Sequence, residues 1–263
     1  MVATRARRPR LGQHFLVDPV LRRRVVEAAG IAPGDEVLEV GAGPGVLTGE
    51  LVRRARRVVA VEVDRRLAAR LRAAVPEAEV VNEDVLRLDL AHWFPSGGEV
   101  VVGNIPYYLT GALIRRLLGA APRPRRLSLV VQREVARRWC GLDGWSLSTL
   151  VVQVFTRPRI ELELPPTAFA PPPSVTSALV VMDVRPRPAV EVSDLDAFFR
   201  FAEAVFHFRR KQLRAALARA LGLPAADAGA LVRGAGIGPE RRAETLTLAE
   251  WERLFETARG KDR

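Results

Sequence analysis

The sequence predicts an α/β fold, in which a largely parallel sheet is covered by helices and followed by a small C-terminal helical domain. Between residues 36 and 135, short apolar runs alternate with amphipathic segments of helical spacing, as in a parallel sheet covered on both faces. From about residue 193, only amphipathic helical segments recur, separated by Gly or Pro. The chain has 263 residues, 48% of them hydrophobic, which suffices for such a core.

The first element expected is a helix over about 18–29, because Asp18 can cap it and Pro19 suits its first position. A strand then runs into a glycine-rich turn at 41–45, and VLTGELVRRA predicts a helix that begins at these glycines. Further strands are expected in RVVAVEVD (57–64), AEVVNEDVL (78–86), EVVVGNIPYY (99–108) and LSLVVQREV (127–135).

The pattern changes at Val151. VVQVFTRPRIELEL (151–164) and SALVVMDV (177–184) are strand-like with no clear helix between them, and predict an antiparallel edge that completes the sheet. RPRPAV (185–190) has the composition of a linker. We therefore expect domains at 1–184 and 191–263. The second domain should be built from helices in DLDAFFRFAEAVFHF (194–208), RRKQLRAALARALG (209–222), AADAGALVRGAG (225–236) and TLAEWERLFETAR (247–259).

The charge of the chain points to a polyanionic partner. Lys and Arg number 41 against 30 Asp and Glu, a net charge of +11. Nearly all of the cations are Arg, which binds phosphate bidentately and stacks on bases, so RNA is the partner these residue types suit. Any single cluster can instead be a solvated face. The clusters are RARRPR (5–10), RRR (22–24), RRARR (53–57), RPRR (123–126) and FRRKQLR (208–214).

Other classes are disfavoured by composition. Cys140 is the single cysteine and there are three histidines, so neither a disulfide framework nor a zinc site is expected. No apolar run approaches the roughly 18 residues that cross a bilayer. We expect a soluble, unexported, cytoplasmic protein without a metal.

Three strand ends together predict an adenosine-bearing cofactor. Gly41, Gly43 and Gly45 would let a ligand approach backbone N–H groups, and their G-x-G-x-G spacing favours a ligand other than a dinucleotide. Glu62 can accept both hydrogen bonds of a ribose diol, although it can equally be a solvated acid at a strand end. Asp84 can accept from an adenine amino group. In open α/β sheets, ligands bind at such strand ends.

The fourth strand end, GNIPYY, suits methyl transfer to an exocyclic nitrogen. The adenine N6 lone pair is delocalised into the ring, and acceptors at Asn104 Oδ1 and the carbonyl of Ile105 would aim it at a methyl donor. Pro106 fixes the turn, while Tyr107 and Phe169 could stack on the two faces of the base. Both rings could instead belong to the core.

These motifs make the chain similar to the ribosomal RNA adenine dimethyltransferases almost from end to end. The resemblance is carried by LGQHFL (11–16), EVGAGPGVLT (39–48), VVAVEVD (58–64), NEDVL (82–86), GNIPYYLT (103–110), VVQREVARR (130–138), PPTAFAPPPSVTSA (165–178), FRRKQLR (208–214) and RAETLTLAEW (242–251).

The resemblance implies a Rossmann-like sheet that binds S-adenosyl-L-methionine through the glycine turn, Glu62 and Asp84, with Gln13 added from the N-terminal motif and Asn104 bordering the methyl donor. It implies dimethylation of N6 on two adjacent adenines in the 3′-terminal hairpin loop of small-subunit (16S) rRNA. The partner would be that rRNA or a pre-30S particle, and the protein a monomer. Ile105 and Tyr108 depart from the commonest family residues without removing a proposed contact.

Three alternatives remain. An Erm-like methyltransferase of large-subunit (23S) rRNA, which confers macrolide resistance, shares the NIPY element, and the C-terminal motifs resemble the small-subunit enzymes more closely. A non-catalytic ribosome-assembly factor would explain the charge but not the intact Asn104 and Tyr107. A nicotinamide-dependent oxidoreductase would leave NIPYY and FAPPPSV without a role.

Overall fold

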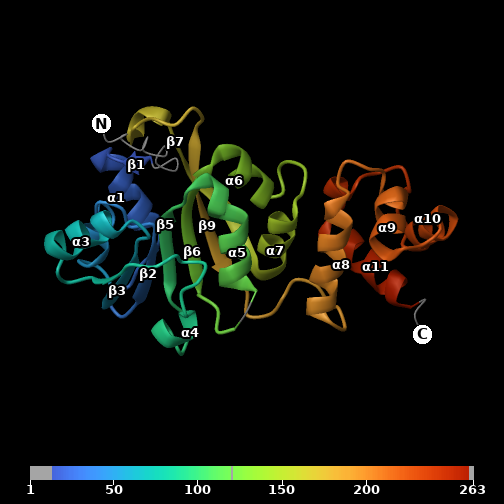
Figure 1. Cartoon of the computed structure of the whole chain (residues 1–263), viewed down its shortest axis with the longest axis horizontal. Helices are drawn as coiled ribbons and strands as arrows, with labels where there is room; N and C mark the ends of the chain where they lie inside the picture. The colour runs from blue at the N-terminus through green and yellow to red at the C-terminus, as the bar shows by residue number, and fades with distance from the viewer. Residues whose placement is uncertain (1–13, 120, 261–263) are drawn as a thin grey trace, which may run out of the picture. The chain divides into compact units, whose positions relative to one another are not determined.

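The computed structural model describes residues 14–119 and 121–260 and contains two sheets. The larger has seven strands in the order β4-β3-β2-β5-β6-β9-β7, and the smaller pairs β1 with β8. The strands are β1 Phe15–Leu16, β2 Glu36–Val40, β3 Arg57–Val61, β4 Glu79–Val81, β5 Val100–Asn104, β6 Arg126–Gln132, β7 Thr156–Leu164, β8 Phe169–Ala170 and β9 Ser177–Val184. Figure 1 labels most of these elements.

The strand order creates a ligand crevice. Strands β2, β3, β4, β5 and β6 are parallel, with Val37 opposite Val58 on one side and opposite Val100 on the other. The chain winds outward from β2 through β3 to β4 and then returns to place β5 on the other side of β2. At such a switch point, the carboxyl ends of the strands leave a crevice between the diverging connections.

The centre of the sheet is fully buried. Residues 58–61 of β3 and 100–102 of β5 are all buried, as expected for strands covered on both faces. One face is packed by Val25 and Val26 of α1, which join Val37, Val58 and Val100 in a single hydrophobic cluster. The prediction of a covered parallel sheet is confirmed.

The described helices comprise three 3-10 turns and α-helices of very different length. They are α1 Pro19–Ala28, α2 Thr48–Leu51, α3 Arg65–Ala74, α4 Leu90–Trp93, η1 Tyr107–Leu109, α5 Thr110–Leu118, α6 Arg133–Trp139, α7 Leu147–Phe155, η2 Pro166–Ala168, α8 Leu195–His207, α9 Leu213–Leu221, α10 Ala225–Gly234, η3 Ala243–Thr245 and α11 Leu248–Arg259.

Local sequence explains where the first helices begin and end. The Asp18 side chain accepts from the backbone of Val20 at 2.8 Å and caps α1 as predicted. The helix expected after the glycine turn is much shorter than the sequence suggests, since α2 covers only Thr48–Leu51. Residues 43–47 form turns in place of the first part of the expected helix. Only five residues then separate the end of α2 from the start of β3.

Contacts divide the chain into two compact units. The first comprises residues up to 113 together with 122–133 and 160–181, and the second comprises 114–121, 134–159 and the chain from 182 onward. Helices α6 and α7 therefore group with the C-terminal helices. The domain boundary predicted between residues 184 and 191 stays a prediction. Residues 185–190 contain no helix or strand.

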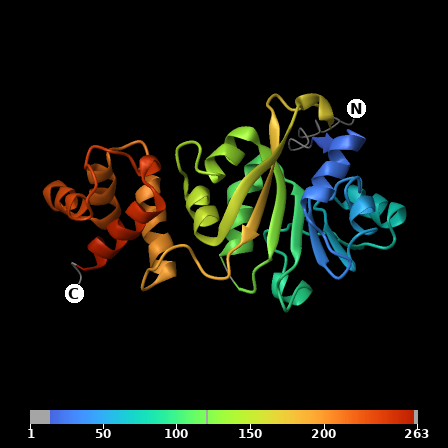
Figure 2. The same ribbon diagram turned by 180° about the vertical axis from the view of Figure 1, so that it is seen from behind.

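One prediction about the edge of the sheet is wrong. Residues 151–155, expected as strand, belong to α7, and β7 begins only at Thr156. A capping box between Ser146 and Thr149 starts this helix, and its apolar residues are buried in contact with other helices, so packing overrides the β-propensity of the Val-rich run. Strand β9 lies between β6 and the edge strand β7 (Figure 2).

The C-terminal helices follow the sequence closely. Helix α8 is capped by Asp194, and α11 begins with a capping box between Thr247 and Glu250. Their apolar faces meet around Trp251, which is buried and lies 4.9 Å from the Phe206 ring, centroid to centroid. Within the described residues, no single helix is long and apolar enough to cross a membrane. Helices α9 and α10 reach that length and hydrophobicity only when taken together, as a pair bent by 115°.

Candidate functional site

A cavity of about 310 Å³ opens at the carboxyl ends of β2, β3 and β5, all within the first compact unit. This volume lies in the range of small-molecule pockets. Its lining residues are His14, Phe15, Val40, Gly41, Val61, Glu62, Val63, Glu83, Asp84, Val85, Asn104, Ile105, Pro106, Tyr108 and Leu109. The switch point of the sheet and the cavity therefore coincide.

The glycine turn reaches the cavity at Gly41. Gly41, Gly43 and Gly45 all have positive φ, at 70°, 57° and 86°, a conformation that costs glycine little. At Gly43 a Cβ atom would also lie 2.8 Å from the Phe15 ring. The turn is tied to β3 because the Gly41 amide donates to the Val61 carbonyl at 2.9 Å.

Glu62 is held rigidly at the end of β3. It is 3% exposed, and its two carboxylate oxygens accept from the backbone amides of Gly43 and Asp64, each at 2.8 Å. A carboxylate oxygen has more than one lone pair, so both atoms keep capacity for a ribose diol. The bond to Gly43 joins the predicted ribose acceptor directly to the predicted glycine turn.

A second buried carboxyl, Glu39, lies behind the turn and was not singled out from the sequence. It is 2% exposed, and burial raises its pKa to about 8; hydrogen bonding with Thr48 opposes the rise and the charge of Glu62 adds to it. Glu39 therefore carries a proton at neutral pH and adds no second negative charge beside Glu62.

The end of β4 is fastened to the end of β3. The Asn82 amide donates to the carbonyls of Glu62 at 2.8 Å and Val63 at 3.1 Å. The following turn is closed by Asp84, whose Oδ1 accepts from the Leu86 amide at 3.0 Å. Asn82 thus fixes the distance between the predicted ribose acceptor and the predicted adenine acceptor.

The amide of Asn104 has a defined orientation. Its Nδ2 donates to the main-chain carbonyl of His14 at 2.6 Å. A carbonyl can only accept, so the NH₂ group must face His14 and Oδ1 must face the other way. Asn104 lines the cavity with Oδ1 left as an acceptor, and its predicted role toward adenine stays a prediction.

Strand β5 reaches this position through a close backbone approach. A Cβ at Gly103 would lie 2.7 Å from the Val40 carbonyl oxygen and 2.8 Å from Ile105 Cδ1. The Ile105 amide donates to the Val130 carbonyl at 3.1 Å, its side chain is buried, and Pro106 follows before the 3-10 turn that begins at Tyr107. The GNIP segment is therefore held on both sides.

The segment that contains Phe169 supports the N-terminal wall of the cavity. Strand β8 pairs with β1, and Leu16 lies opposite Phe169. The His14 ring Nδ1 lies 2.7 Å from the Pro171 carbonyl, so its N–H donates there. Phe169 itself is 4% exposed and belongs to the hydrophobic core. Its stacking role stays a prediction.

The cavity brings together most, but not all, of the predicted site residues. Gly41, Glu62, Asp84, Asn104, Ile105 and Pro106 line it. Within the described chain, Gly43, Gly45 and Phe169 lie close by in sequence or packing but do not line it. Gln13 lies outside the described residues, and for Tyr107 only the backbone is described.

Several wall residues were missed from the sequence. His14 and Phe15 belong to a quoted motif, GQHFL, but only Gln13 was assigned a role. Val63 and Tyr108 are 62% and 59% exposed, and both line the cavity. Exposed apolar and aromatic side chains at a cavity rim are a signal that appears only once the fold is known. Among the described residues, no group of three or more His, Cys, Asp or Glu could hold a metal ion.

A Rossmann-like sheet with a glycine turn, a buried acid at the end of β3 and an Asn-x-Pro element at its switch point defines a methyltransferase that uses S-adenosylmethionine. Residues 4–259 match the family model described as ribosomal RNA adenine dimethylase. The chain belongs to this family.

Relatives of similar length support this membership. The chain is 40% identical over 251 residues to a protein named ribosomal RNA small subunit methyltransferase A from Dehalococcoides mccartyi, with 93% of this chain and 86% of the relative covered. The protein of the same name from Moorella thermoacetica is 39% identical over 261 residues, with coverage of 94% and 90%.

Solved structures confirm the fold over nearly the whole chain. The crystal structure of the 23S rRNA methyltransferase ErmE is similar with a TM-score of 0.71 and 32% identity, covering 92% of this chain and 98% of the other. A dimethyladenosine transferase from Plasmodium falciparum has a TM-score of 0.77 at 23% identity, with coverage of 95% and 98%.

Proposed function

We propose that this chain transfers methyl groups from S-adenosylmethionine to N6 of two adjacent adenines in the 3′-terminal hairpin loop of small-subunit rRNA. The orientation of Asn104 carries the proposal, because it leaves Oδ1 as an acceptor on the wall of a cavity whose other walls suit an adenosine-bearing cofactor. The names of the relatives in Dehalococcoides and Moorella support the small subunit as the target.

The residues of the cavity fit the cofactor. Glu62 has two buried oxygens with spare lone pairs, and the glycine turn has no side chains where a ligand would approach. Glu62 would hold the ribose, and Asp84 the adenine. When bound, S-adenosylmethionine supplies an electrophilic methyl group carried on a sulfonium.

Asn104 would act by positioning the target base. Its Oδ1 and the Ile105 carbonyl would accept the two N6 hydrogens of adenine, so that the lone pair of N6 points at the methyl group. The proton of N6 would leave to solvent after attack, and no covalent enzyme intermediate is needed. We propose that Tyr107 and Phe169 stack on the base, with Gln13 completing the cofactor site.

RNA affinity would come in part from the loop between α8 and α9. Arg209, Arg210, Lys211 and Arg214 are exposed, and residues 207–211 line a hollow of about 340 Å³. Within the described residues, none of these four cations forms an ion pair. The cluster at 53–57 differs, since Arg54, Arg56 and Arg57 pair with nearby glutamates at 2.7–3.0 Å.

The test is mass spectrometry of small-subunit and large-subunit RNA after separate incubation with the purified protein and S-adenosylmethionine. Two adjacent dimethyladenines near the 3′ end of the small-subunit RNA are expected. A mark on the large-subunit RNA alone would instead support the activity named for ErmE, whose structure is 32% identical. RNA binding without any mark would favour an assembly factor. The Asn104→Ala protein should bind the cofactor but lose most of its turnover.

A further inference from the structure

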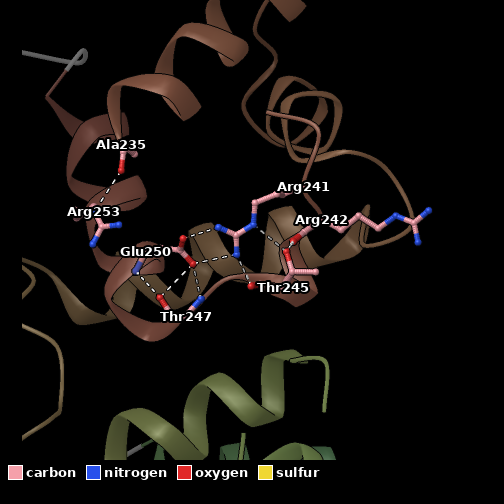
Figure 3. A network of polar contacts seen from close by, with 7 residues as sticks. All are labelled: Ala235, Arg241, Arg242, Thr245, Thr247, Glu250 and Arg253. Carbon is pink, nitrogen blue, oxygen red and sulfur yellow. Dashed lines mark hydrogen bonds and ion pairs between the residues drawn. The ribbon is translucent and has the colours of Figure 1, made fainter. Parts of the chain in front are cut away.

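The connection between α10 and α11 is held by a partly exposed network of polar contacts around Arg241 (Figure 3). The Arg241 Nε donates to Thr245 Oγ1 at 3.3 Å, and its Nη2 donates to the Thr245 carbonyl and to Glu250 Oε2, the latter at 3.1 Å. Its Nη1 pairs with the other Glu250 oxygen. The two side chains are 33% and 15% exposed. A bidentate Arg–carboxylate pair of this kind fixes geometry as well as adding energy.

The backbone of the same connection caps α9. The Leu213 amide donates to the Arg241 carbonyl at 2.6 Å, and the Arg214 amide donates to the Pro239 carbonyl at 3.2 Å. The N-cap residue Gln212 makes no side-chain cap. The first N–H groups of a helix need acceptors, and two of those of α9 are satisfied by this separate segment of chain.

These two sets of bonds link Arg241 to the loop 208–212 between α8 and α9, which we call the basic loop. Residues 209–212 lead directly into α9, so the carbonyls of Pro239 and Arg241 fix where that loop ends and where α9 begins. We propose that Arg241 and Glu250 are positioning residues that hold the basic loop in the arrangement that contacts RNA phosphates. The proposal rests on the proposed role of this loop in RNA binding.

Glu250, the partner of Arg241, also caps α11, and a conservative substitution can separate these two roles. Glu250 Oε2 also accepts from the Thr247 amide at 2.8 Å and so completes the capping box of α11. Glutamine serves in that position of a capping box as well, but it cannot form a charged bidentate pair with arginine. Glu250→Gln therefore keeps the helix cap and weakens the link to Arg241.

The neighbouring Arg242 provides a matched control. Its side chain is 57% exposed and lies 4.0 Å from Glu244, and in Figure 3 it extends away from the Arg241 network. Arg242→Gln removes the same charge from the same turn as Arg241→Gln without touching Glu250 or Thr245. A difference between the two variants is therefore not an effect of net charge.

The experiment combines amide hydrogen exchange with RNA binding in the full-length protein. In Arg241→Gln and Glu250→Gln, exchange at the amides of Leu213 and Arg214 should accelerate about tenfold or more, while Arg242→Gln should match the wild type. Affinity for a hairpin fragment of small-subunit rRNA should fall about tenfold in the first two variants. The slope of log K against log salt should decrease by more than the roughly 0.7 expected for one lost phosphate contact.

Three results decide the matter. Unchanged exchange at Leu213 and Arg214 in both variants would overturn the proposal. Faster exchange with wild-type RNA affinity would also overturn it, because the network would then serve α9 alone. The Arg209→Gln/Arg210→Gln protein tests the underlying role of the loop, since wild-type affinity there would refute the RNA contact whatever the exchange data show. Circular dichroism and cofactor binding confirm that each variant is folded.

Discussion

Replacing Glu39 with Gln should make the stability of the protein less sensitive to alkaline pH. Burial raises the pKa of Glu39 from its ordinary 4.5 to about 8. Between these values the unfolded chain ionises this group while the folded protein keeps it protonated, so the folded state binds more protons. The contribution of Glu39 to stability is therefore constant below about pH 4.5, falls as pH rises to about 8 and then levels off.

The magnitude follows from the difference of about 3.5 pH units between the two pKa values. At about 1.36 kcal/mol per unit, the wild type should lose on the order of 5 kcal/mol from this group between pH 4.5 and pH 8, a loss that Glu39→Gln lacks. The free energy of unfolding of Glu39→Gln, relative to the wild type, should therefore increase steadily from pH 5 to pH 8.

Urea unfolding at several pH values measures this difference, with the transition of the first unit followed by the fluorescence of Trp93, which lies in that unit. Glu77, in an exposed turn, provides the matched control, since Glu77→Gln removes a carboxylate without removing a buried one. A difference between Glu39→Gln and wild type that stays constant within about 0.5 kcal/mol from pH 5 to pH 9 would refute the assignment of a buried proton to Glu39.

Three further substitutions test the packing and the ion pairs of the first compact unit. Gly103→Ala should cost about 1–3 kcal/mol and weaken cofactor binding, because the new methyl group would meet the Val40 carbonyl; unaltered thermal unfolding would contradict this. Phe169→Ala should cost about 3–5 kcal/mol, whereas Phe169→Leu should keep most of that stability, so loss of turnover in the Leu variant would support base stacking. Arg57→Met should cost about 1–3 kcal/mol at neutral pH. Arg57 hydrogen-bonds to Glu79 and lowers its pKa, so the part of this cost that comes from the ion pair is complete above about pH 4.5 and is lost as the pH falls through the lowered pKa. The unfolding free energies of wild type and Arg57→Met should therefore approach each other on acidification, while the bond from Arg57 to the Trp93 carbonyl persists.

The fold was predictable where local signals agree with the packing. The strands β2, β3 and β5 are apolar runs rich in branched residues that end in glycine or polar residues, and their presence and burial follow from that pattern. Residues 147–155 were not predictable in this way. Their Val-rich composition favours a strand, and only the capping box at Ser146 and burial among other helices decide for a helix.

The site was predictable as a set of strand ends but not as a set of contacts. The sequence separates Glu62 from Gly43 by 19 residues, and their direct hydrogen bond depends on how β2 and β3 align. The buried proton of Glu39 depends on neighbours from two elements, Thr48 and Glu62, that no local pattern connects. The sequence alone predicts which residue types could bind a ligand. Their hydrogen-bond partners and pKa values depend on which residues the fold places beside them.

The role of Asn104 depends both on its sequence motif and on a contact that only the fold provides. The motif predicts that its oxygen accepts from adenine, but an isolated Asn side chain could turn either end toward the base. The choice is made by the His14 carbonyl, 90 residues away, which takes the NH₂ group. His14 is held in turn by its ring contact with the Pro171 carbonyl and by the pairing of β1 with β8. The conformation of the FAPPP segment therefore determines which atom of Asn104 faces the cavity, so a change in that segment should reduce methyl transfer even where it leaves every residue of the GNIPYY motif intact.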